Sequence, residues 1–185
     1  MKNLALKSYS FIILFFSIFY LTAQEELPKG LTETERELLP QFQFNSLVIS
    51  GPPEGPVRAA AEWEEVEYLV IRWTNAYQNI LRQIVEVGVQ ECKVLITTQN
   101  ESSVTNYLTN QGVDLTNVEF LNTGSNSIWI RDYGGNTIYS EDVGERALTD
   151  WIYNRPRPLD DIMPTQHAMM VGMPIYVTDT GTNDL

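Results

Sequence analysis

The side chains best suited to chemistry lie in residues 129–136, which read Trp-Ile-Arg-Asp-Tyr-Gly-Gly-Asn. A carboxylate such as Asp132 only accepts hydrogen bonds, and its two oxygens match paired N–H donors of a guanidinium group. Trp129 could cover the planar face of that cation, and Gly134 and Gly135 would let the backbone approach a ligand closely. The stretch predicts a guanidinium site. The open alternative is a turn aspartate that caps its own backbone, with Trp129 as core filling.

A second stretch, residues 154–158, alternates arginine with proline and reads Asn-Arg-Pro-Arg-Pro. Prolines keep a chain extended, and in an extended chain residues two apart point the same way. The guanidinium groups of Arg155 and Arg157 can therefore converge on one anion, such as a substrate carboxylate. The alternative is a surface loop in which both arginines pair with Asp160 or Asp161.

The chain has one cysteine, Cys92, and one histidine, His167. Cys92 begins an apolar strand and is predicted to be a small buried hydrophobe rather than a nucleophile, because no base is placed to activate it. His167 is predicted to lie on the surface of a helix. A single residue of each kind cannot form a metal cluster, so we expect no metal and no other cofactor.

The N-terminus is predicted to be a secretory signal peptide covering residues 1–23. It has a basic start, an apolar stretch from Phe11 to Leu21 that is too short to span a bilayer, and small residues before a cleavage point after Ala23. The protein is therefore expected to be secreted or periplasmic. Loss of the two lysines in this segment would change the net charge from −12 to −14, which argues against nucleic acid or an anionic membrane as partner.

The elements that position these residues alternate along the chain. Residues 24–60 are rich in glutamate and end in a Gly-Pro-rich break, which indicates a pro-segment or linker. Residues 61–185 are predicted to be the folded domain. Its predicted helices are 77–88, 100–112 and 161–172, and its predicted strands are 66–73, 93–98, 118–121, 127–130, 137–139, 147–153 and 174–177. This alternation predicts an α/β fold.

Two of these motifs carry a family resemblance. The runs Trp-Ile-Arg-Asp-Tyr-Gly-Gly (129–135) and Ile-Tyr-Asn-Arg-Pro-Arg-Pro (152–158) resemble the guanidine-modifying superfamily, most closely the bacterial peptidyl-arginine deiminases and their agmatine deiminase relatives. Ala-Glu-Trp-Glu at 61–64 resembles that family's entry motif. The resemblance implies a pseudo-fivefold α/β propeller (pentein-like), of which this chain would cover about the first two blades.

The resemblance also implies a mechanism. In that family a cysteine attacks the guanidinium carbon, a histidine moves protons, and two acidic residues hold the guanidinium nitrogens, so that ammonia leaves and water releases the ureido product. Asp132 matches the first acidic residue. Trp129, Arg155 and Arg157 are the expected substrate-binding residues. The catalytic histidine and cysteine would lie beyond Leu185, so the chain alone is expected to be inactive.

Three hypotheses follow for the function. The first is the N-terminal fragment of an exported arginine or agmatine deiminase-like hydrolase, acting on an arginine-containing peptide or a small guanidino compound. The second is a secreted, non-enzymatic guanidinium-binding module or an inactive fragment. The third is an exported α/β domain with no role in guanidine chemistry.

Overall fold

The computed structural model describes residues 26–42, 54–141, 144–151 and 153–177. The signal peptide predicted at 1–23 lies outside these ranges, as does part of the predicted linker. Within the described ranges, no helix is both long enough and apolar enough to cross a membrane.

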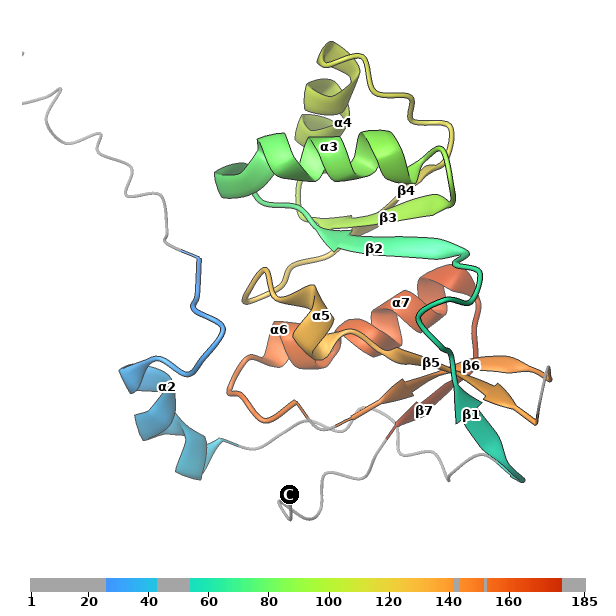
Figure 1. The fold of residues 1–185 in the computed structure, drawn as a ribbon. Helices are drawn as coiled ribbons and strands as arrows, with labels where there is room; N and C mark the ends of the chain where they lie inside the picture. Colours follow the sequence, from blue (N-terminus) through green and yellow to red (C-terminus); the bar gives the residue numbers. More distant parts are fainter. Residues whose placement is uncertain (1–25, 43–53, 142–143, 152, 178–185) are drawn as a thin grey trace, which may run out of the picture.

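One layer of the molecule is a parallel sheet in the order β2-β3-β4, formed by β2 (Tyr68–Arg72), β3 (Lys93–Thr98) and β4 (Val118–Asn122). Two crossover helices, α3 (Gln78–Gly88) and α4 (Glu101–Asn110), cover its outer face (Figure 1). A short 3-10 turn, η2 (Asn75–Tyr77), leads into α3.

Local sequence explains this layer. Val94, Leu95 and Ile96 of β3 are fully buried, because a central parallel strand covered on both faces is apolar throughout. The side chain of Asn100 caps α4 by accepting a hydrogen bond from the backbone N–H of Ser103 at 3.1 Å.

The second layer is a mixed sheet in the order β1-β5-β6-β7. Its strands are β1 (Val57–Ala59), β5 (Asn136–Ser140), β6 (Arg146–Asp150) and β7 (Ile175–Val177). The β1-β5 and β5-β6 pairs are antiparallel and the β6-β7 pair is parallel.

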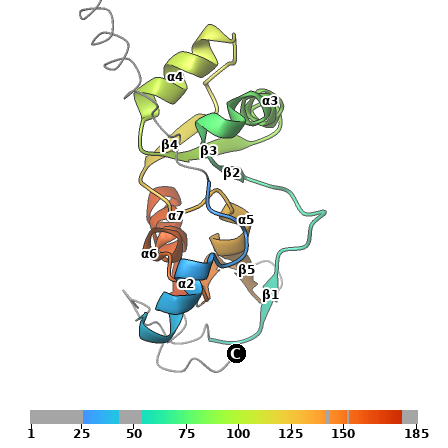
Figure 2. The ribbon, with the colours of Figure 1, turned by 90° about the vertical axis from the view of Figure 1, so that its left-hand side faces the viewer.

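Three helices lie between the two sheets, as both ribbon views show (Figures 1 and 2). They are α5 (Ile130–Tyr133), α6 (Pro158–Asp161) and α7 (Met163–Val171). The fold is therefore a mixed α/β arrangement, as the sequence predicted.

The segment predicted as a linker contains regular structure. Helix α2 (Glu33–Leu38) begins with a capping box, in which Thr32 Oγ1 accepts from the N–H of Glu35 and Glu35 Oε2 accepts from the N–H of Thr32. The 3-10 turn η1 (Leu39–Gln41) follows it. Strand β1 also falls within the range 24–60, so the sheet begins upstream of Ala61.

Two further predictions from the sequence, for residues 127–130 and for His167, are wrong. Residues 127–130 do not form a strand, because this run enters the one-turn helix α5. His167 is not on the helix surface: it is only 5% exposed, and its Nε2 lies 3.1 Å from Thr97 Oγ1. Burial lowers its pKa to about 4.

Candidate functional site

The turn that leads into α5 is held by the buried carboxylate of Asp160. Its Oδ1 accepts hydrogen bonds from the backbone N–H groups of Asn126 and Ser127 at 2.7 and 3.0 Å, and its Oδ2 accepts from the Ser127 hydroxyl at 2.7 Å. Burial raises the pKa of Asp160 from its ordinary value. Asp160 therefore positions the turn. Among the described residues, neither Asp160 nor Asp161 forms the hydrogen bond or ion pair with Arg155 or Arg157 that the alternative sequence interpretation required.

Tyr133 holds the same turn from the other end. Its hydroxyl donates to the carbonyl of Ser127 at 2.8 Å, and its ring is 1% exposed. Gly134 closes the turn: its N–H donates to the Ile130 carbonyl at 2.8 Å, and a Cβ at Gly134 would lie 2.8 Å from that same oxygen. The glycine is thus required by the close backbone contact that ends α5.

Asp132 lies in α5, directly after the turn that Asp160 and Tyr133 hold, and its carboxylate is largely buried. The side chain is 19% exposed, and Oδ1 lies 3.6 Å from the Nζ of Lys29. The other oxygen, Oδ2, is buried and has no hydrogen-bond partner among the described residues. A turn aspartate that caps its own backbone would use its oxygens on nearby N–H groups, whereas Oδ2 accepts from none. The carboxylate therefore retains acceptor capacity for a donor that is not part of the described chain.

The two arginines of the Arg-Pro-Arg-Pro stretch both face the N-terminal segment. Arg157 is 1% exposed, its Nε donates to Glu35 Oε1 at 2.7 Å, and its Nη2 donates to Glu35 Oε2 at 3.1 Å. The same Nη2 reaches the carbonyls of Pro28 and Gly30 at 2.9 and 3.0 Å. Arg155 donates from Nε to the carbonyl of Lys29 at 3.0 Å. In this structure the anion on Arg157 is thus a carboxylate of the chain itself.

Trp129 also donates a hydrogen bond to the N-terminal segment. Its indole Nε1–H donates to the carbonyl of Leu27 at 2.9 Å. All four predicted site residues are therefore brought to one face of the molecule, and each contacts the segment that precedes or begins α2. The role of these residues toward a substrate remains a prediction.

Sequence reasoning missed Tyr153, although it lies within the motif quoted for residues 152–158. Its ring is 3% exposed, packs edge-on against Tyr133 with centroids 5.8 Å apart, and lies 5.4 Å below the guanidinium of Arg155. Burial raises the pKa of its hydroxyl. Within the described ranges, the buried side-chain polar atoms without a well-formed hydrogen bond are Asp132 Oδ2, Tyr153 Oη and Arg157 Nη1, and the last two side chains also interact with each other. All three belong to this one region.

Sequence reasoning also missed Lys29 and Glu35, because residues 24–60 were interpreted as a linker. The one available signal was the capping-box spacing of Thr32 and Glu35, which marks the start of a helix. Arg157, by its hydrogen bonds and its charge, is the main cause that lowers the pKa of Glu35 to about 2.

A cavity of about 460 Å³ opens at the carboxyl ends of β2 and β3, where α/β sheets commonly bind ligands. Glu26 reaches its lining, where its carboxylate accepts a hydrogen bond from the hydroxyl of Thr74. The segment 26–30 therefore runs from this cavity past Trp129 to Asp132.

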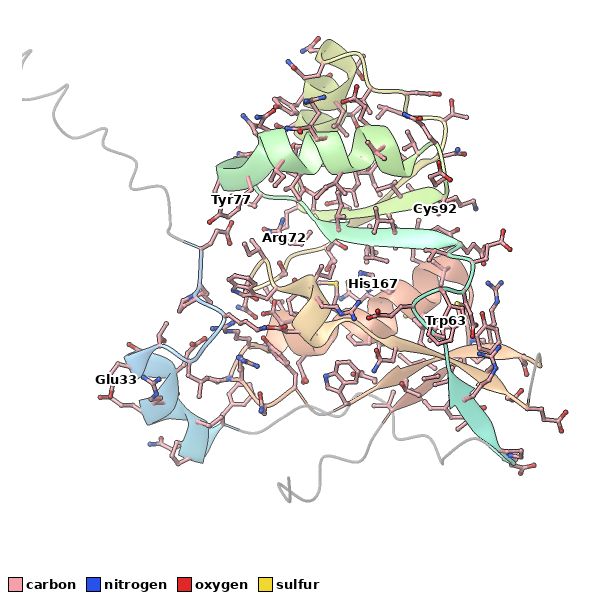
Figure 3. All side chains as sticks on the ribbon, viewed as in Figure 1. Glu33, Trp63, Arg72, Tyr77, Cys92 and His167 are labelled. Atoms are coloured by element: carbon pink, nitrogen blue, oxygen red, sulfur yellow. The ribbon has the colours of Figure 1, made fainter. Side chains whose placement is uncertain are left out.

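Cys92 and His167 do not meet. Figure 3 shows Cys92 at one end of the β2-β3-β4 layer and His167 between the two layers. Cys92 is half-buried and precedes β3, so it lies outside the strand that it was predicted to begin. No group of three or more His, Cys, Asp and Glu in the described part of the chain could hold a metal ion.

A known protein family matches the part of the chain that contains these motifs. A family model described as Porphyromonas-type peptidyl-arginine deiminase matches residues 56–165, more than half of the chain. This span includes Trp129, Asp132, Arg155 and Arg157 and leaves out residues 26–42.

Solved structures match the fold over a similar range. The agmatine deiminase of C. jejuni is 26% identical with a TM-score of 0.56, and the match covers 67% of this chain and 40% of that one. A variant of that enzyme with substrate bound is 24% identical, with a TM-score of 0.56, and covers 70% and 42%. A protein of Porphyromonas gingivalis assigned as an arginine deiminase is 14% identical, with a TM-score of 0.55, and covers 66% and 40%. The chain thus spans about two fifths of the length of these relatives.

Proposed function

Because the chain belongs to the Porphyromonas-type peptidyl-arginine deiminase family, we propose that it is the N-terminal part of an exported hydrolase that acts on a guanidinium group. The reaction adds water across the terminal C–N bond: a guanidinium and water give a ureido group and ammonium. The two sheets described above would form part of a larger, propeller-like domain that surrounds the site.

The observation that carries this proposal is the free, buried carboxylate oxygen of Asp132. A guanidinium can donate two parallel N–H bonds to one carboxylate. Asp132 already attracts a cation in this structure, because the ammonium of Lys29 lies 3.6 Å from Oδ1. We assign Asp132 the role of holding the guanidinium nitrogens, which places its carbon for attack. The partial shielding of the carboxylate from water strengthens that interaction.

The groups that attack the guanidinium carbon and move protons are proposed to lie beyond Leu185. The separation of Cys92 from His167 (Figure 3) and the low pKa of His167 support this, because a buried histidine whose pKa is about 4 is a poor proton carrier near neutral pH.

For the substrate, we propose a peptide that ends in arginine in preference to agmatine. Agmatine lacks the carboxylate that a cationic side chain would bind, whereas a C-terminal arginine offers a guanidinium to Asp132 and a carboxylate to Arg155 and Arg157. Charge-assisted hydrogen bonds of this kind contribute about 1.5–3 kcal/mol each. Arg155 is the more available of the two, because Arg157 is already engaged by Glu35.

The test is ureido product formation by the full-length protein on three substrates: agmatine, a peptide with internal arginine, and the same peptide ending in arginine. We expect the last to be preferred and Asp132→Asn to lose nearly all turnover. The matched control is Asp114→Asn, because Asp114 is an exposed turn aspartate that accepts from the N–H and the hydroxyl of Thr116. Wild-type kcat/KM in Asp132→Asn would end the proposal, and equal turnover of agmatine would end the substrate preference.

The non-enzymatic module remains the second candidate. It is favoured by the same carboxylate, since the free oxygen of Asp132 can accept a guanidinium donor whether or not a reaction follows. Binding of the peptide by the full-length protein without ureido product would select it. Export is tested separately, by the mass of the secreted protein, which we expect to begin at Gln24.

A further inference from the structure

The N-terminal strap, defined here as residues 26–42, lies directly over the proposed guanidinium site. Trp129 binds the carbonyl of Leu27, Asp132 faces the ammonium of Lys29, and Arg155 binds the carbonyl of Lys29. Arg157 binds the strap at three residues, Pro28, Gly30 and Glu35. Figures 1 and 2 show the strap, in blue, beside α5 and α6.

The groups that the strap presents are those of a cationic peptide. Asp132 meets a positive side chain, and the N–H donors of Trp129 and Arg155 meet main-chain carbonyls within two residues of that side chain. A substrate peptide carrying an arginine would offer the same types of group in the same order. Lys29 thus stands where the substrate's cationic end is proposed to bind.

The two ion pairs between the strap and the site differ in burial and in length. The Arg157 and Glu35 side chains are 1% and 10% exposed, and 2.7 Å separates Arg157 Nε from Glu35 Oε1. Lys29 is 65% exposed, and its ammonium stops 3.6 Å from Asp132. An exposed, long ion pair is weak, so the Lys29 side chain can leave Asp132 while the main-chain carbonyls of residues 27–30 stay bound to Trp129, Arg155 and Arg157.

The strap is also separate from the part of the chain that matches the family. The match begins at residue 56 and contains all four site residues, whereas the strap ends at residue 42. The strap therefore lies outside the matched range and packs on the candidate site within it.

We propose that the strap is an intramolecular competitor for the guanidinium site, in which Lys29 occupies Asp132 and the Glu35–Arg157 pair anchors the segment. The inference rests on the proposed function, because it requires that Asp132 binds a guanidinium. A substrate then binds only the fraction of molecules in which Lys29 has left Asp132, and the apparent affinity is reduced by that fraction.

The test is the Kd of methylguanidinium for the full-length protein, measured by calorimetric titration in wild type, Lys29→Ala and Lys29→Arg. Lys29→Ala removes the competing cation at an exposed position, so it should tighten binding by about two- to fivefold. Lys29→Arg supplies a guanidinium that can bind a carboxylate bidentately, so it should weaken binding. With a peptide ending in arginine, KM should follow the same order while kcat stays unchanged.

The matched control is Arg36→Ala, which removes a cation from the same strap. Arg36 pairs with Glu33 on the exposed side of α2 and has no contact with the four site residues among the interactions described. It should leave the Kd unchanged. Equal Kd values in wild type, Lys29→Ala and Lys29→Arg would overturn the competitor while leaving the guanidinium site standing. Failure of all of them to bind methylguanidinium would overturn the proposed function, and the competitor with it.

Discussion

Glu35 and Arg157 form a buried ion pair although 122 positions separate them in the sequence, with 2.7 Å between Oε1 and Nε. Through this pair the segment before the family-type domain is attached to the motif that carries the two predicted substrate-binding arginines. The structure therefore connects the stability of the N-terminal strap to the geometry of the site.

Glu35→Gln should lower the free energy of unfolding by about 3 kcal/mol, because it leaves Arg157 charged, buried and without its carboxylate. The substitution is selective, since glutamine can still complete the capping box with Thr32. Glu33→Gln is the matched control: Glu33 is 80% exposed on the same helix and pairs with Arg36, and Figure 3 shows it pointing away from the body of the molecule. Urea unfolding measures both. Equal losses in the two variants would contradict the buried-pair account.

His167 should make the protein sensitive to mild acid. Its folded pKa of about 4 lies below its ordinary 6.5, so between these values the unfolded chain binds a proton that the folded chain does not. Stability is therefore fully present above pH 6.5 and is lost as pH falls toward 4, by at most about 3 kcal/mol.

The measurement for His167 is the difference in unfolding free energy between wild type and His167→Gln at pH 7.5 and pH 4.5. The difference is needed because burial raises the pKa values of Asp150 and Asp161 to about 7 and about 6. These two carboxyls make the folded chain more stable as the pH falls, which is opposite to the effect of His167. These carboxyls are common to both proteins and cancel. We expect wild type to lose stability relative to the variant at pH 4.5, and a difference independent of pH would contradict the assignment.

Asp132→Asn should not destabilise the fold. Asp132 Oδ2 is buried without a hydrogen bond among the described residues, and the Lys29 ammonium lies 3.6 Å from Oδ1, so the burial of the charge costs free energy that this long, exposed ion pair offsets only in part. We expect thermal unfolding at the same or a higher temperature than in wild type, together with the loss of turnover proposed above. A loss of more than about 1 kcal/mol would instead identify Asp132 as a structural turn residue.

Gly134→Ala should disturb the turn that carries Asp132. A methyl group at this position would lie 2.8 Å from the backbone oxygen of Ile130, which cannot move without opening α5. We expect a loss of about 1–3 kcal/mol, measured by urea unfolding. Gly135→Ala is the control, because its nearest contacts are at 3.4 Å. Equal tolerance of both substitutions would contradict the close-contact account.

The sequence predicted the parallel layer well. The strand expected at 93–98 is β3 to the residue, and the strand expected at 66–73 contains β2 at 68–72. These segments are apolar over a length typical of strands and are separated by amphipathic helices with caps. Such signals are local, so they could be interpreted without knowledge of the rest of the chain.

Residues 127–130 show where local signals fail. The run of Ile128, Trp129 and Ile130 is too short for periodicity to distinguish a strand from a helix start. The helical start depended on Asp160, whose carboxylate accepts hydrogen bonds from the backbone N–H groups of the preceding turn. His167 was placed wrongly for the same kind of reason, since its burial results from packing against Thr97 in another layer.

The sequence by itself determined the α/β class, the family-type motifs and the identity of the four candidate site residues, because these depend on residue type and spacing. Only the tertiary structure decided what those residues contact. It placed the segment interpreted as a linker over the site, with Lys29 on Asp132 and Glu35 on Arg157. Ion pairs between segments so distant in sequence leave no periodic pattern in the sequence. They form only when folding closes the long loop between the two segments, and burial of the core offsets the entropy cost of that closure.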